Sequence, residues 1–190
     1  MASFALLSAL CFAVADLRGL PAAALFVLSG AIAHMFMVPM PTTRPGHKAE
    51  QSVAAAINVA AVLLFPLHWA ILIVTTAMLF GRRGPWVKRA YNVAQAATSG
   101  GCAGLIWQMS SSRQVSDVSS IPFVIGACAV YFLCNSFTIA GIVALASGMP
   151  VTLTWLRTYR HTWPATFGVV FVGPLIAILW SMSAWTIALA

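Results

Sequence analysis

Five amide and hydroxyl side chains lie inside long apolar stretches of the chain. Asn92 and Gln95 are three residues apart and would share one face of a helix. Asn135 and Ser136 adjoin near the middle of a later stretch, and Asn58 lies in an earlier one. In a membrane such groups either bridge two helices through hydrogen bonds or line a polar pocket. We expect these five residues to form a site for a small ligand, with the interhelical bridge as the alternative.

Two histidines also lie within apolar runs, where neutral imidazole could bind haem. His34 stands near the end of its run and His68 follows a proline, so they do not suit facing positions at equal depth. The run from His34 to Met40 holds soft ligands for Cu(I), but methionine in apolar helices more often fills space. We therefore expect no haem, copper or other cofactor.

The acidic residues argue against catalysis. Asp16, Glu50 and Asp117 are far apart in the sequence, so no pair of carboxylates is available for general acid–base chemistry. The chain contains no HExxH, Walker loop, GxGxxG or nucleophile elbow. We expect that the protein is not an enzyme.

The composition predicts an integral membrane protein. Of the 190 residues 61% are hydrophobic and only 7% are charged, whereas soluble domains carry about 25% charged residues. Too few charges are present to cover a water-soluble globule, and no solvated cationic face for nucleic acid is evident. We expect one all-α membrane domain over residues 1–190.

The apolar segments predict about six transmembrane helices, one or more of them short or broken. Residues 4–15 are short for a span, and residues 52–80 are too long for one straight helix and contain Pro66. Two short segments that meet near Phe65 and Pro66 explain the second case better than one kinked helix. In order, the apolar segments cover residues 4–15, 20–38, 52–80, 90–109, 121–147 and 165–190. Residues 39–51 are expected to form a loop, 151–163 an interfacial segment, and Gly173–Pro174 a potential break.

The cations predict the orientation in the membrane. They gather in residues 82–89 and 157–161, which two apolar segments separate. The two regions should therefore lie on one side, which the positive-inside rule makes cytoplasmic, with loop 110–120 outside. We expect the cations to contact anionic head-groups or a partner protein. They are Arg82, Arg83, Lys88, Arg89, Arg157 and Arg160.

Two short motifs suggest a family. Residues 85–95 read PWVKRAYNVAQ and residues 131–136 read YFLCNS. Together with the broken segment before them, they resemble the multi-pass membrane region that precedes HD-type phosphohydrolase or GGDEF domains in bacterial signalling proteins. The order of these segments along the chain is more distantly similar to that in the substrate-binding membrane subunits of energy-coupling-factor transporters. The resemblance implies sensing or ligand binding, and implies no cyclic-dinucleotide chemistry for this chain; the stretch 4–38 is longer than the family leads us to expect.

These observations lead to one expected function and two alternatives. We expect a sensory or ligand-binding module, in the bacterial inner membrane, that signals to a cytoplasmic protein partner or assembles as a homo-oligomer. The first alternative is the substrate-binding subunit of a transporter for a vitamin-like or metal solute, with a cavity that loop 110–120 bounds. The second is a structural subunit of a membrane complex.

Overall fold

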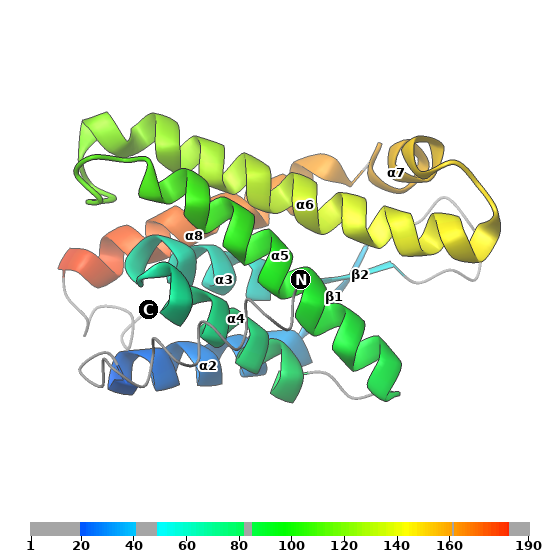
Figure 1. Cartoon of the computed structure of the whole chain (residues 1–190), viewed down its shortest axis with the longest axis horizontal. Coiled ribbons are helices and arrows are strands. Elements are labelled where there is room, and N and C mark those ends of the chain that lie inside the picture. Colours follow the sequence, from blue (N-terminus) through cyan, green and yellow to red (C-terminus); the bar gives the residue numbers. More distant parts are fainter. Residues whose placement is uncertain (1–19, 41–48, 82–84, 161, 183–190) are drawn as a thin grey trace.

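The computed structural model describes residues 20–40, 49–81, 85–160 and 162–182, and helices dominate them (Figure 1). The predicted segment 4–15 lies outside these residues, as do Arg82 and Arg83. The α-helices are α2 (Leu20–Met35), α3 (Ala54–Leu64), α4 (Leu67–Gly81), α5 (Trp86–Gln108), α6 (Ile121–Ser147), α7 (Val151–Tyr159) and α8 (Trp163–Met182). A short 3₁₀ helix, η2 (Val118–Ser120), precedes α6.

A short β-hairpin departs from the all-helical expectation. Strand β1 (Met37–Met40) pairs antiparallel with β2 (Ala49–Ser52), and Met37 lies opposite Ser52. The predicted loop 39–51 therefore begins and ends in paired strands. Part of the reason is Pro39, which favours an extended backbone at the residue before it.

The long apolar stretch 52–80 is two helices, as the sequence predicts. Helix α3 ends at Leu64, Phe65 is extended with φ −109° and ψ 153°, and α4 begins after Pro66. Proline has no N–H to continue the helical ladder, and its ring disfavours a helical residue before it. The break is thus fixed by a single residue.

Helix α3 forms the centre of the fold. Eight of its eleven residues are buried, and it packs against α4, α5, α8 and α2, with a smaller contact to α6. Its buried residues are mostly alanine and valine, which allow neighbouring helices to come close. Helix α3 therefore has no free face.

Glycine lets α8 lie directly on α3. A Cβ added at Gly173 would lie 2.7 Å from the Cβ of Val59 and 2.8 Å from the carbonyl oxygen of Ala56. The potential break at Gly173–Pro174 is not a break, because α8 continues through Pro174 to Met182. The two residues serve close packing instead of ending the helix.

Helices α5 and α6 run antiparallel and side by side (Figure 1). The start of α5 and the end of α6 consequently lie at one end of the bundle, and α7 follows α6 at that same end. The predicted span 121–147 matches α6 residue for residue. The basic region 82–89, which we interpret from the sequence as a loop, is helical in its last residues, because α5 begins at Trp86 and includes Lys88 and Arg89.

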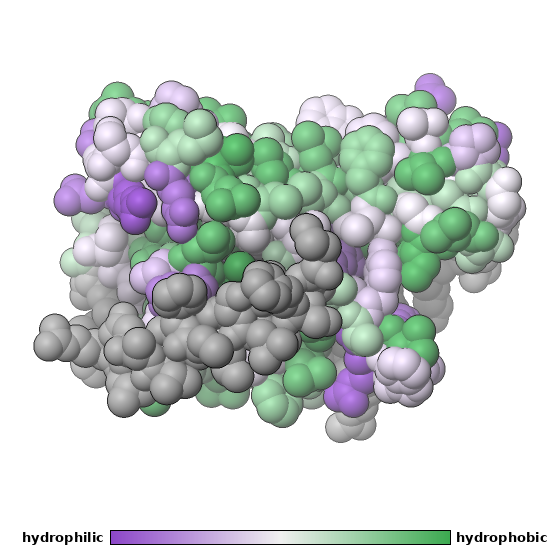
Figure 2. Space-filling model, viewed as in Figure 1, coloured by the Kyte–Doolittle hydropathy of each residue, from purple (hydrophilic) through white to green (hydrophobic). Residues whose placement is uncertain are grey.

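Hydrophobic residues predominate along the visible part of α6, with paler residues between them (Figure 2). Among the described residues two helical stretches, Val118–Ser147 and Trp163–Met182, are long and apolar enough to cross a membrane, judged by length and composition. The shorter apolar helices are Leu20–Met35, Ala54–Leu64 and Leu67–Phe80.

The contact between α8 and α3 gives the first testable prediction. Gly173→Ala should lower the free energy of unfolding by about 1–3 kcal/mol, because the new methyl group meets the backbone of α3. Gly168→Ala in the same helix is the matched control, since a Cβ there meets nothing within 4 Å. It should be neutral or stabilising by up to about 1 kcal/mol. Thermal unfolding in detergent measures both, and equal midpoints would refute the close approach.

Candidate functional site

Gln95 and Asn135 bond each other across the interface of α5 and α6. The Gln95 Nε2 atom donates to Asn135 Oδ1 at 2.8 Å and to the Asn135 carbonyl at 3.3 Å. One turn nearer the start of α5, the Tyr91 hydroxyl donates to the carbonyl of Thr138. Two residues that the sequence singles out are therefore brought into direct contact. The contact itself is the interhelical bridge that the sequence offers as an alternative to a pocket.

Asn58 reaches α6 from the central helix. Its Nδ2 atom donates to the hydroxyl of Tyr131 at 3.0 Å, and both side chains are buried. The Asn58 Oδ1 atom is buried and has no hydrogen-bond partner among the described residues. An unmade hydrogen bond of this kind costs about 1–3 kcal/mol.

Ser99 adds a second incompletely bonded group at the same level. The antiparallel pairing of Gln95 with Asn135 places Ser99, one turn further along α5, level with Tyr131. Ser99 is fully buried, and within the described residues its Oγ atom has no hydrogen-bond partner. We call the group formed by Asn58, Gln95, Ser99, Tyr131 and Asn135 the polar layer.

Ser136 connects the polar layer to α7. The Trp155 Nε1 atom donates to Ser136 Oγ at 2.9 Å, and Ser136 Oγ donates to the Leu133 carbonyl at 3.2 Å. Trp155 also stacks on Phe137, with ring centroids 5.0 Å apart and planes 4° from parallel. Because Ser136 follows Asn135, the residue that holds α7 adjoins the polar layer in the sequence.

Asn92 completes the predicted set. It is buried on α5, one turn before Gln95. The sequence alone does not single out Tyr131 or Trp155, because an aromatic residue in an apolar stretch resembles ordinary packing. A useful signal for Tyr131 is its spacing from Asn135, since Tyr131 lies one helical turn before that residue; Trp155 lies on another helix and has no such signal.

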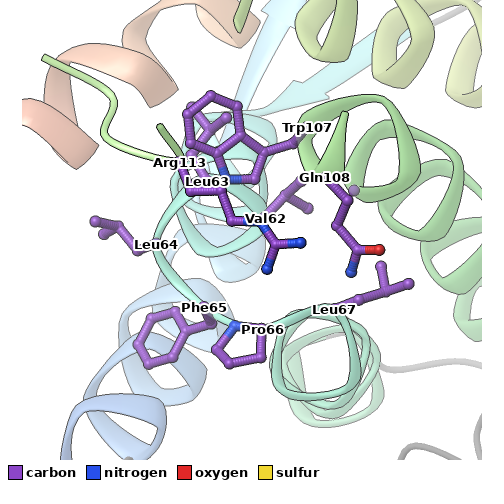
Figure 3. A pocket seen from close by; sticks show the side chains of 10 residues that line it. Val62, Leu63, Leu64, Phe65, Pro66, Leu67, Trp107, Gln108 and Arg113 are labelled. Atoms are coloured by element: carbon purple, nitrogen blue, oxygen red, sulfur yellow. The ribbon is translucent and has the colours of Figure 1, made fainter. Parts of the chain in front are cut away.

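Neither of two hollows among the described residues is lined by Asn58, Asn92, Gln95, Asn135 or Ser136. The first, about 210 Å³, lies at the break between α3 and α4 and includes Arg113 (Figure 3). The second, about 430 Å³, is an apolar groove between α2 and α4. The ligand-binding role of the five predicted residues stays a prediction.

The described residues of the two predicted basic regions lie at the end where α5 begins and α6 ends. Lys88, Arg157 and Arg160 are exposed, and Arg89 donates from Nη2 to the Leu79 carbonyl at 3.2 Å. The Nη1 atom of Arg157 contacts the sulfur of Met149 at 3.5 Å. The two predicted basic regions thus share one end of the molecule as far as the described residues reach.

The opposite end carries the loop between α5 and η2. Asp117 caps η2, because its Oδ1 atom accepts a hydrogen bond from the Ser119 backbone N–H at 3.1 Å. That bond, with those from the Ser119 and Ser112 hydroxyls, lowers the pKa of the Asp117 carboxyl below its ordinary value. The hydroxyls of Ser110 and Ser112 also bond Ser120, at 2.9 and 2.6 Å. The loop is therefore held in a defined conformation.

The metal-ligating side chains do not cluster. In the part of the chain that the structure describes, no three His, Cys, Asp or Glu residues lie close enough to hold one metal ion. His34 belongs to α2 and is buried, and His68 belongs to α4, where its ring lies 6.3 Å from that of Trp69.

Comparison with protein-family models, with curated proteins and with solved structures gave no match for this chain. The assignment of a function therefore depends on the geometry described above.

The pair of Asn58 and Tyr131 gives the second prediction. Tyr131→Phe should destabilise the protein by about 1–3 kcal/mol, because it leaves the buried Asn58 amide without its acceptor. Asn58→Leu should also destabilise, because it leaves the Tyr131 hydroxyl unpaired. The double variant should lose less than the sum, since neither polar group is left behind. Unfolding in detergent measures the three values, and strict additivity would contradict a direct bond.

Proposed function

We propose that this chain is an integral membrane module of the bacterial inner membrane that senses a small ligand or the state of the bilayer. It passes the change to a cytoplasmic protein partner. The exposed surface of the two longest apolar helices is suited to lipid. Only 33% of the apolar window in Val118–Ser147 and 22% of that in Trp163–Met182 are buried inside the fold. The core helix of a soluble protein would be mostly buried.

Large apolar side chains on these helices point outward. Leu145 in α6 is 86% exposed and Leu175 in α8 is 59% exposed. With three acidic residues in the whole sequence, water is a poor solvent for this surface and lipid is a good one. We propose about six crossing or partly crossing segments, among which α6 and α8 have full length and α3 and α4 share one broken element.

The ends of the bundle support the orientation. Lys88, Arg157 and Arg160 are exposed at the end that also carries Trp86 and Trp163, which are 76% and 51% exposed. Tryptophan and basic residues are typical of the head-group region, with the basic residues on the cytoplasmic side. We propose that this end contacts anionic head-groups and the partner.

The observation that carries the sensory role is a set of three hydrogen bonds that tie α3, α5 and α7 to α6. Asn58 of α3 bonds Tyr131, Gln95 of α5 bonds Asn135, and Trp155 of α7 bonds Ser136, which follows Asn135 in the sequence. The unpaired Asn58 Oδ1 and Ser99 Oγ atoms leave the layer incompletely bonded. A second packing that satisfied them would gain about 1–3 kcal/mol per group, which is the scale of a two-state switch.

One observation favours the transporter subunit as a second candidate. That function calls for a cavity bounded by loop 110–120, and Arg113 of this loop lines the cavity at the α3–α4 break. The cavity lies at the loop end of the bundle, however, away from the polar layer.

The orientation gives the third prediction. In a chain whose four cysteines are replaced by alanine, Lys88→Cys and Arg157→Cys should both react with a membrane-impermeant maleimide only from the cytoplasmic side. Ser119→Cys should react only from the outside. Labelling of intact cells and of inverted membrane vesicles distinguishes the sides. Reaction of Lys88→Cys and Arg157→Cys from opposite sides would exclude the proposed topology.

The polar layer and its neighbour Ser136 give the fourth prediction. Gln95→Leu should loosen Asn135 and Ser136 and thereby speed hydrogen–deuterium exchange at the amides of α7 by about tenfold, the equivalent of about 1.4 kcal/mol. Trp155→Phe removes the hydrogen bond from α7 to Ser136 and should speed exchange in α7 to a similar extent. The measurement is made in lipid nanodiscs by mass spectrometry.

Thr98→Ala is the matched control for this experiment. Thr98 is exposed on α5 and bonds only the Ala94 carbonyl of its own helix, at 2.9 Å, so exchange in α7 should not change. If Trp155→Phe speeds exchange in α7 and Gln95→Leu does not, the polar layer is not coupled to α7 and the proposed relay is wrong.

A further inference from the structure

The cavity at the break between α3 and α4 combines apolar walls with a cation. Leu63, Phe65 and Leu67 come from the two sides of the break, Trp107 and Gln108 come from the last turn of α5, and Arg113 comes from the following loop. Figure 3 shows the guanidinium of Arg113 directed into the middle of these side chains. The volume of the cavity is about 210 Å³.

The walls follow from two residues that break ordinary helix packing. Pro66 separates α3 from α4. In a continuous helix the residue at position 66 would donate its N–H to the carbonyl of Val62, and proline has no N–H to donate. Gly104 lets α5 approach the break, since a Cβ there would lie 2.5 Å from Leu67 Cδ1 and 3.7 Å from Val62 Cγ1. The cavity is thus a consequence of how α5 meets the break.

The backbone of Arg113 is held in an uncommon conformation. Its φ is 49°, the left-handed region that residues other than glycine seldom adopt. The hydrogen bonds of Ser110, Ser112 and Asp117 fix the loop on both sides of it. Backbone conformations of this kind gather at functional sites, and Arg113, although exposed, lines the cavity.

We propose that this cavity binds a small monocarboxylate with a compact apolar body. Arg113 would pair with the carboxylate through two parallel N–H bonds, the geometry for which a guanidinium is suited. Gln108 offers an amide beside it, and Leu63, Leu67 and Trp107 contact the body. An apolar cavity of about 150 Å³ admits benzene, so this cavity has room for a ring of that size with its carboxyl group.

This proposal names the chemical class of the ligand that the sensory module would detect. It rests on the proposed function only for the biological role of that ligand. Binding can be measured without any signalling partner. If benzoate does not bind, the proposed coupling of the polar layer to α7 through Trp155 is unaffected. If that coupling is absent, the proposed binding site is unaffected.

The test uses the purified full chain in detergent micelles, with benzoate as the probe and calorimetry as the readout. Benzoate should bind at least about tenfold more tightly than benzamide, its neutral counterpart. Arg113→Asn should abolish this preference while it keeps a residue that tolerates a left-handed backbone. Arg113→Lys retains the charge without the planar fork and should bind benzoate with intermediate affinity.

Three outcomes would overturn the proposal. One is equal affinity of the native protein and of Arg113→Asn for benzoate, and another is no binding by the native protein above the background of empty micelles. The third is equally tight binding of inorganic phosphate, which would show an anion site that makes no use of the apolar walls. If Arg113→Asn fails to fold, the comparison of benzoate with benzamide on Arg113→Lys and the native protein decides the question.

Discussion

The burial of α3 on every side is the constraint on which the other features depend. A helix of eleven residues is too short to cross a bilayer of about 30 Å alone, so other helices must surround it. Lipid tails are as apolar as leucine, and helices in a membrane therefore associate through close packing of small residues. The alanines of α3 and Gly173 of α8 provide that packing. Helices α2, α4, α5 and α8 all pack on this short helix, whereas α6 lies mainly against α5.

Helix α3 also connects the two places where chemistry is concentrated. Asn58 near its start belongs to the polar layer, and Leu63 and Leu64 at its end line the cavity that Arg113 enters. Six residues separate Asn58 from Leu64, which corresponds to about 9 Å along the helix axis. A rigid helix of this length transmits a displacement at one end to the other. The cavity and the bond from Asn58 to α6 thus lie on one continuous helix, although they share no residue.

The features that depend on local chemistry were accessible from the sequence. Pro66 alone predicts the break, and Gly148, which adopts a left-handed φ of 67°, marks the end of α6. The partners of the buried polar groups were not accessible, because they depend on which helix faces which. Nothing in the sequence pairs Asn58 with Tyr131, which is 73 residues away. Arg113 escaped notice for a similar reason, since a charged residue in a polar loop gives no sign that its side chain turns inward.

The length of α6 has a consequence for the membrane around it. Its 27 residues extend about 40 Å at 1.5 Å per residue, whereas the hydrocarbon core is about 30 Å thick. Such a helix stays within the core only if it tilts, and a thinner bilayer demands a steeper tilt. Helix α7 is joined to the end of α6 through Gly148 and Pro150 and moves with it. In the bilayer that we propose for this chain, hydrophobic mismatch would therefore displace α7.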